Sequence, residues 1–167
     1  MGGPLRVPGF EDIGFGEPAG ANDAAMLRRN ALFSGLGEEP LARVLPAFRM
    51  ATLPREALLY VRGRIARRVF LIASGSVAIV QRTAHRPTTV ALLGPAAFTG
   101  EHALLRPRGR HAFSAVCRAE SRIGFVDGDV LLAALPGLPW VGLNVAWAMH
   151  RRVADAGLAI DALIAEP

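Results

Sequence analysis

Hydrophobic and polar positions follow two different periods along this chain. From residue 22 to about 48, apolar residues recur at helical spacing in two pieces, which a turn at 34–37 separates. From Met50 to 126 the apolar runs become short and β-branched, with turn signals such as "RGR", "SG" and "RPRG" between them. No helical period interrupts these runs. The pattern therefore predicts seven or eight short antiparallel strands in a jelly-roll type of sandwich or barrel.

The helical period returns near the end of the chain. Asp127 and Asp129 begin a predicted short helix that ends at Pro136, and a longer helix is expected to begin near Pro139. Apolar residues recur along the longer helix in steps of four, four, three, four and three. They are Val145, Met149, Val153, Ala156, Ile160 and Leu163. This coiled-coil spacing predicts an apolar seam that docks on its own domain or pairs with a second copy. Pairing is favoured because the seam runs beyond the reach of a small barrel.

The predicted fold class is therefore α+β, an antiparallel β-roll with N-terminal helices and a long C-terminal dimerisation helix. The Gly- and Pro-rich start has no apolar core of a signal peptide, and it predicts a flexible arm over 1–22. The remaining chain divides into a domain at 23–135 and a helix at 136–167. Residues 130–149 carry no charge and could span a bilayer by length. Pro136, Gly137 and Pro139 interrupt the segment, so two buried helices are expected instead, and no membrane association.

Composition narrows the classes of function. The chain has 167 residues, of which 51% are hydrophobic and 20% charged, as in a globular domain. All 19 basic residues are arginine and the net charge is +5, which favours anionic ligands. So complete a use of arginine reflects genome composition better than nucleic-acid binding. The single cysteine, Cys117, cannot form an internal disulfide, which fits a reducing cytoplasm.

Enzyme signatures are missing from the sequence. It has neither a phosphate loop ending in Lys-Ser or Lys-Thr nor a dinucleotide fingerprint. The four histidines lack the spacing of zinc ligands. We therefore expect a protein that is not an enzyme and that holds no metal or cofactor.

The stretch "FTGEHALLRPRGRHA" (98–112) holds the candidate chemistry. Gly100 permits a tight turn, and Glu101 begins a short helix whose free N–H groups could hold an anion. Arginines follow at 106, 108 and 110. The stretch is either a site for a small anion or a polar surface loop that holds nothing.

Three segments in this order resemble one family. "RNALFSGLGEEPLARVL", "LLYVRGRIARRVFLIASGSVAIV" and "LLGPAAFTGEHALL" are similar to the cyclic-nucleotide-binding domain of the catabolite-activator (Crp–Fnr) family, over about 25–165. The resemblance implies that Glu101 binds a ribose hydroxyl, that a downstream arginine pairs with the cyclic phosphate, and that the long helix forms a homodimer. The candidate ligand residues are Gly100, Glu101, His102, Ala103, Arg110, His111 and Ala112.

The phosphate clamp departs from the family's pattern. Arg110-His111-Ala112 resembles the family's arginine, small residue and alanine. Strand alternation, however, places His111 on the apolar face of Phe113 and Ala115 and turns Arg110 away. Either Arg110 serves through a bulge, or a histidine has replaced the clamp.

Two further departures from the family's pattern concern recognition of the nucleotide base and binding to DNA. Ala156 and Gly157 stand where the family's cyclic-AMP responders present hydroxyls. The family continues into a helix-turn-helix, whereas this sequence ends at Pro167, so direct DNA binding is not expected. Two hypotheses stay open. The chain is a cytoplasmic regulatory sensor of cyclic AMP, cyclic GMP or a similar phosphate ligand, or it is a ligand-free dimerisation module for an unidentified protein partner.

Overall fold

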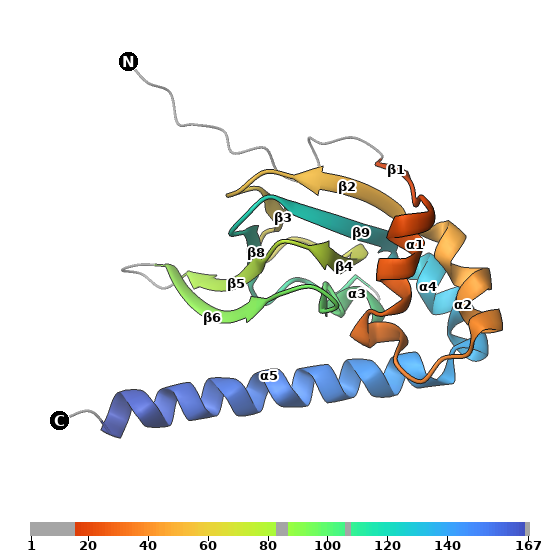
Figure 1. The fold of residues 1–167 in the computed structure, drawn as a ribbon. Coiled ribbons are helices and arrows are strands. Elements are labelled where there is room, and N and C mark those ends of the chain that lie inside the picture. Colours follow the sequence, from red (N-terminus) through yellow and green to blue (C-terminus); the bar gives the residue numbers. More distant parts are fainter. Residues whose placement is uncertain (1–15, 83–86, 106–107, 166–167) are drawn as a thin grey trace, which may run out of the picture.

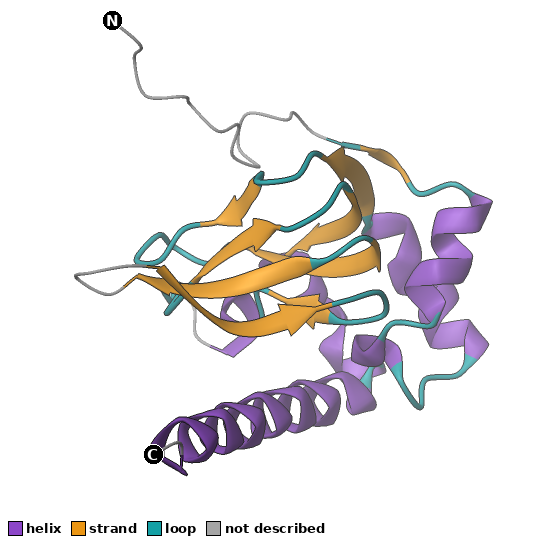
Figure 2. Cartoon of the chain, turned by 60° about the vertical axis from the view of Figure 1, so that its left-hand side comes forward, coloured by secondary structure: helices purple, strands orange, loops and turns teal. Residues whose placement is uncertain are grey.

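The computed structural model describes residues 16–82, 87–105 and 108–165, without the side chains of Arg82 and of 156–165. Two β-sheets stack on each other, short helices gather at one end, and one long helix runs beneath them (Figure 1). The same layers are visible from a second direction in Figure 2. The predicted α+β class, with an antiparallel roll between N-terminal and C-terminal helices, is confirmed.

The N-terminal region forms the two helical pieces that the sequence predicts. They are α1 (Ala21–Arg28) with the 3-10 turn η2 (Ala31–Phe33), and α2 (Glu38–Val44) with the 3-10 turn η3 (Leu45–Ala47). Within the range predicted as an arm, β1 (Glu17–Pro18) pairs with β2 (Arg49–Leu53), and residues 1–15 lie outside the described residues. Arg122 holds this segment through ion pairs of 2.6 Å to Glu17 and 2.9 Å to Asp23. Its hydrogen bond to Asp23 lowers the pKa of that carboxyl.

All strands of the two sheets pair antiparallel. The first sheet has the order β1, β2, β9 (Ser121–Asp127), β4 (Arg68–Ser74) and β7 (Phe98–Thr99). The second has the order β3 (Leu58–Tyr60), β8 (Ser114–Cys117), β5 (Val77–Arg82) and β6 (Pro87–Leu93). The two-residue strands β1 and β7 are the ones that the sequence pattern did not predict, because a period of two cannot be read from two residues.

Strand β4 separates two hydrophobic cores. Phe70 and Ile72 face the second sheet, whereas Val69 and Leu71 face the helices. This alternation follows from the period of two in a strand that is covered on both sides. Cys117 is buried in the core between the sheets, and burial raises the pKa of its thiol.

The chain ends in α4 (Gly128–Ala134), the 3-10 turn η4 (Leu135–Gly137) and α5 (Pro139–Ala165), close to the predicted boundaries. The predicted apolar seam on α5 is only partly available to a second copy. Val145 is 2% exposed and lies in the helical core, with Met149 at the edge of that core. Val153 is 72% exposed. Ala156, Ile160 and Leu163 lie outside the described side chains.

Val145 and Val153 differ in exposure because a spacing of four residues does not stay on one face of an α-helix. Each step of four turns roughly 40° past a full turn of an α-helix, so Val153 lies about 80° around from Val145. The first part of the seam therefore docks on its own domain and is not available for pairing with a second copy. Beyond the first turn of α5, the exposed large apolar side chains among the described residues of this helix are Leu143, Trp147 and Val153.

Within the described ranges no single helix has the length and hydropathy to cross a membrane. The stretches Gly128–Gly137 and Pro139–Asp155 pass that test only as a pair, and they are bent by 120°.

Candidate ligand site

The turn before α3 (His102–Leu105) positions the site's carboxylate. Gly100 has φ of +82°, and a Cβ there would lie 2.4 Å from the carbonyl oxygen of Arg68. Only glycine fits this left-handed position so close to β4. The N–H of Ala103 donates to the Gly100 carbonyl at 3.0 Å, which closes the turn and commits one of the N–H groups predicted to face a ligand. Ala103 itself is buried against Gly128.

Glu101 points inward from this turn, with 8% of its side chain exposed. Its Oε1 accepts a hydrogen bond of 3.0 Å from Nη1 of Arg152 on α5. Its Oε2 is buried and has no hydrogen-bond partner among the described residues. Nδ1 of His102 lies 3.8 Å from Oε1. The site therefore keeps one carboxylate oxygen available for a donor.

Arg152 is a site residue that the sequence analysis missed. Its Nη2 donates to the carbonyl of Phe98, and its guanidinium lies 5.6 Å from the centre of the Phe98 ring. One sequence signal could have found it. Arg152 comes seven residues after Val145 and four after Ala148, so it lies on the buried stripe of α5 where a charge needs a partner.

His111 lies near the Glu101 turn, with its ring centre 6.3 Å from that of His102. It is 4% exposed and stacks on Tyr60 with 3.8 Å between ring centres and 10° between ring planes. Its Nδ1 is buried and has no hydrogen-bond partner among the described residues. Burial, with a smaller effect of His102, lowers the pKa of His111 to about 4, although Glu101 opposes the shift. The imidazole is therefore neutral at pH 7.

Tyr60 fixes the position of the histidine ring. Its hydroxyl lies 2.5 Å from the hydroxyl of Thr99, beside the Gly100 turn. Burial raises the pKa of Tyr60, so the phenol stays protonated. Tyr60 also belongs to the site, and no local signal in the sequence marks it.

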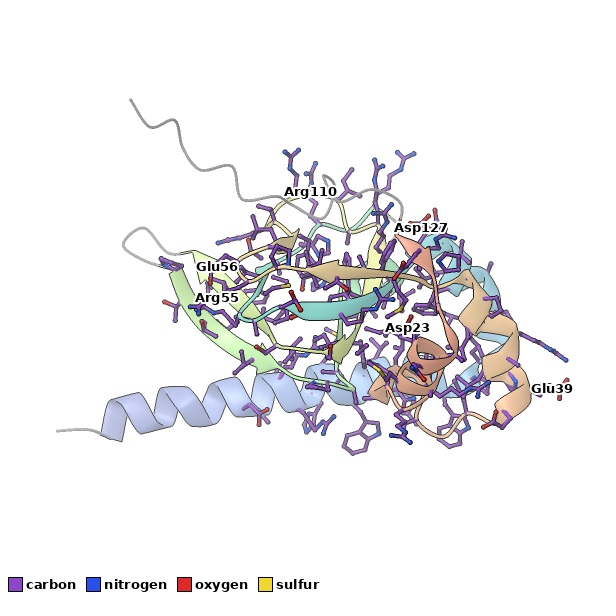
Figure 3. All side chains as sticks on the ribbon, turned by 45° about the horizontal axis from the view of Figure 1, so that its top comes forward. Asp23, Glu39, Arg55, Glu56, Arg110 and Asp127 are labelled. Atoms are coloured by element: carbon purple, nitrogen blue, oxygen red, sulfur yellow. The ribbon has the colours of Figure 1, made fainter. Side chains whose placement is uncertain are left out.

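Arg110 lies outside this cluster. Its side chain is exposed, and Nη1 donates to the carbonyl of Gly63 at 2.6 Å. Figure 3 shows it at the periphery of the molecule. Ala112 is exposed as well, whereas Ala115 and Cys117 are buried. The alternation argued from the sequence thus holds, and His111 rather than Arg110 shares the buried side with Glu101.

The described residues contain no group of three or more His, Cys, Asp or Glu side chains that could hold a metal ion. The arrangement offers instead one carboxylate oxygen, one imidazole nitrogen and one arginine that balances the carboxylate. Such a set can hydrogen-bond a hydroxyl-bearing ligand, and it has no free permanent positive charge for a phosphate.

Comparison with known proteins defines the class. The sequence model of the family described as "Cyclic nucleotide-binding domain" matches residues 50–136. The chain therefore belongs to the cyclic nucleotide-binding domain family, a family of regulatory domains, as the resemblance implied.

Within that family the chain is similar to Crp-type regulators. It is 30% identical over 138 residues to the cyclic AMP receptor protein of Thermus thermophilus. This match covers 82% of the present chain and 63% of the Thermus protein. The crystal structure of the Thermus thermophilus catabolite activator protein matches with a TM-score of 0.68, over 80% of this chain and 63% of that one. The chain thus spans less than two thirds of these relatives.

A shorter solved structure matches almost throughout. The N-terminal domain of a transcriptional regulator from Streptomyces coelicolor is 25% identical, with a TM-score of 0.61. The match covers 81% of this chain and 94% of that one. The chain therefore resembles the effector domain of Crp-type regulators.

Proposed function

We propose that this chain is a ligand-sensing regulatory domain that binds a cyclic nucleotide, or a related molecule with ribose-type hydroxyls, between Glu101 and His111. The observation that carries the proposal is a pair of buried polar atoms, Oε2 of Glu101 and Nδ1 of His111, for which the described residues offer no hydrogen-bond partner. An unsatisfied buried polar group costs about 1–3 kcal/mol. A ligand that donates a hydroxyl to the carboxylate and bonds to the imidazole would recover that cost.

The same geometry sets the expected affinity. A neutral imidazole offers one hydrogen bond, whereas an arginine offers a bidentate and permanently charged one. A charge-assisted bond is worth about 1.5–3 kcal/mol, so a cyclic phosphate should bind roughly ten- to a hundred-fold more weakly than at a site with an arginine clamp. Selectivity should come from the hydroxyls at Glu101, and less from the phosphate.

Arg152 is the residue that would couple ligand binding at Glu101 to the position of α5. This residue joins α5 to Glu101 and Phe98, so a ligand that bonds to Glu101 changes what Arg152 can contact. A difference in affinity for two positions of α5 would then shift their populations. The exposed apolar residues Leu143 and Val153 support pairing of α5 with a second copy as the output. The downstream partner stays unidentified.

A specific observation favours a second candidate, a ligand-free interaction module of the same fold. Side chains of the chain itself already occupy the site. Arg152 bonds Oε1 of Glu101, and Tyr60 covers one face of the His111 ring. If these contacts persist in solution, the fold would serve only to dimerise and to hold a partner.

Isothermal calorimetry of the purified chain with cyclic AMP and cyclic GMP distinguishes the two. Binding that Glu101→Gln weakens tenfold or more and that Arg110→Gln leaves unchanged supports the sensor. Arg110 is the matched control because its exposed side chain bonds the Gly63 carbonyl and lies outside the Glu101 cluster. Thermal unfolding of each variant confirms that it is folded. Absence of heat up to millimolar ligand supports the ligand-free module, and binding that both variants retain contradicts the proposed site.

A further inference from the structure

A groove with a volume of about 480 Å³ lies between the N-terminal helices and α5. It is separate from the Glu101 site and shares no residue with it. The side chains that line it and could contact a polar or aromatic ligand include Arg28, Arg29, Ser34, Asn144, Trp147 and Arg151. Its volume falls within the roughly 300–1,000 Å³ of small-molecule pockets.

The groove is strongly positive. Three guanidinium groups line it, and no carboxylate is among the described residues that do so. Arg28 lies 3.9 Å from Glu38, but both side chains are largely exposed, so this pair is weak. Arg29 and Arg151 form no ion pair with any described residue. A concave surface of one charge concentrates its field and attracts ions of the opposite sign.

One wall of the groove is held in place. Nδ2 of Asn144 on α5 donates to the carbonyls of Leu32, at 3.0 Å, and of Ser34, at 2.8 Å. Asn30, which also lines the groove, is buried, and its Nδ2 donates to the Ala97 carbonyl at 2.8 Å. The backbone around the arginines is thus preorganised, which reduces the entropy lost when a ligand binds.

Trp147 adds a flat apolar surface beside the arginines. Its side chain is 59% exposed, and within the described residues its ring contact is an edge-on approach to His150 at 6.1 Å. An exposed tryptophan at a positive groove is suited to stack a planar ring, since every nucleobase has a π-face. Arginines and an aromatic together match a ligand that carries phosphates at one end and a base at the other.

We propose that this groove is a second ligand site, for a nucleotide with several phosphates. Arg28, Arg29 and Arg151 would bind the phosphates, and Trp147 would stack on the base. The groove and the Glu101 site involve neighbouring residues of α5. Arg151 lines the groove, while its neighbour Arg152 bonds Glu101. Occupation of either site therefore acts on the same turn of α5. The assignment stands on the groove alone and does not depend on ligand binding at Glu101.

The test uses the full chain with Trp140→Phe, which leaves Trp147 as the only tryptophan of the two in the sequence. Titration with ATP should quench the fluorescence of Trp147 with a dissociation constant in the micromolar range. Arg29→Gln and Arg151→Gln should each weaken ATP binding about tenfold, the value of one charge-assisted hydrogen bond. Calorimetry of the wild-type chain should give the same dissociation constant.

Arg55→Gln is the matched control, because it removes the same charge from an exposed arginine whose ion pair is with Glu56, away from the groove. Four results would overturn the assignment: no binding at millimolar ATP, an equal loss of affinity in Arg55→Gln, binding that Glu101→Gln abolishes while Arg151→Gln leaves it intact, or inorganic triphosphate that binds as tightly as ATP. The last would show that the ring of the nucleotide makes no contact.

Discussion

Protonation of His111 should destabilise the fold as the pH falls below neutral. In the folded chain the imidazole is buried against Tyr60, and burial lowers its pKa from the ordinary 6.5 to about 4. The unfolded chain therefore binds more protons than the folded chain between these two values. Stability that is present above pH 6.5 is lost as the pH falls towards 4.

The size of the effect follows from the two pKa values. With 6.5 in the unfolded chain and about 4 in the folded chain, the free energy of unfolding should fall by about 2 kcal/mol between pH 7 and pH 5. Asp23, whose pKa lies below its usual 3.8, loses its stabilising effect only at lower pH. The interval from 7 to 5 thus isolates the histidine from the ion pair of Arg122.

His111→Phe removes the titrating group and keeps a ring that can stack on Tyr60. Urea unfolding at pH 7 and pH 5 should show a drop of about 2 kcal/mol for the wild type and almost none for this variant. His150→Gln is the control, since it removes an exposed histidine and should keep the wild-type drop. An unchanged drop in His111→Phe would refute the argument that His111 is buried in its neutral form.

Two other perturbations test the contacts of the site. Arg152→Ala leaves both oxygens of the buried Glu101 carboxylate without a hydrogen-bond partner among the described residues and should cost about 2–3 kcal/mol. Glu101→Gln in the same chain should restore most of this loss, and failure of that rescue in urea unfolding would mean that Arg152 acts by packing on Phe98. Gly100→Ala should cost more than about 2 kcal/mol, because its Cβ would meet the Arg68 carbonyl, whereas Gly63→Ala, at φ of +81° with open space around it, should cost only about 1 kcal/mol. Equal thermal shifts of the two glycine variants would contradict the clash.

Local rules determine what could be predicted from the sequence. Alternation with a period of two placed His111, Phe113 and Ala115 on one side of the strand. The structure buries His111 and Ala115, and Phe113 packs half-buried against the core between the sheets. The glycine before Glu101 predicted a turn, and Gly100 has the left-handed backbone that such a turn requires. These features depend on residues within a few positions of each other, so residue types and their spacing are enough to predict them.

Contacts between distant elements needed the tertiary structure. Arg152 reaches Glu101 across 51 positions of sequence, and Tyr60 meets His111 only because β3 lies beside β8. The apolar period of α5 did not say which face would dock, and only the fold shows that Val145 is covered by its own domain. The sequence alone thus determined the alternation along the strand that follows His111 and the turn at Gly100. How the elements are placed against one another decided which residues meet, because packing depends on the whole core and not on any local period.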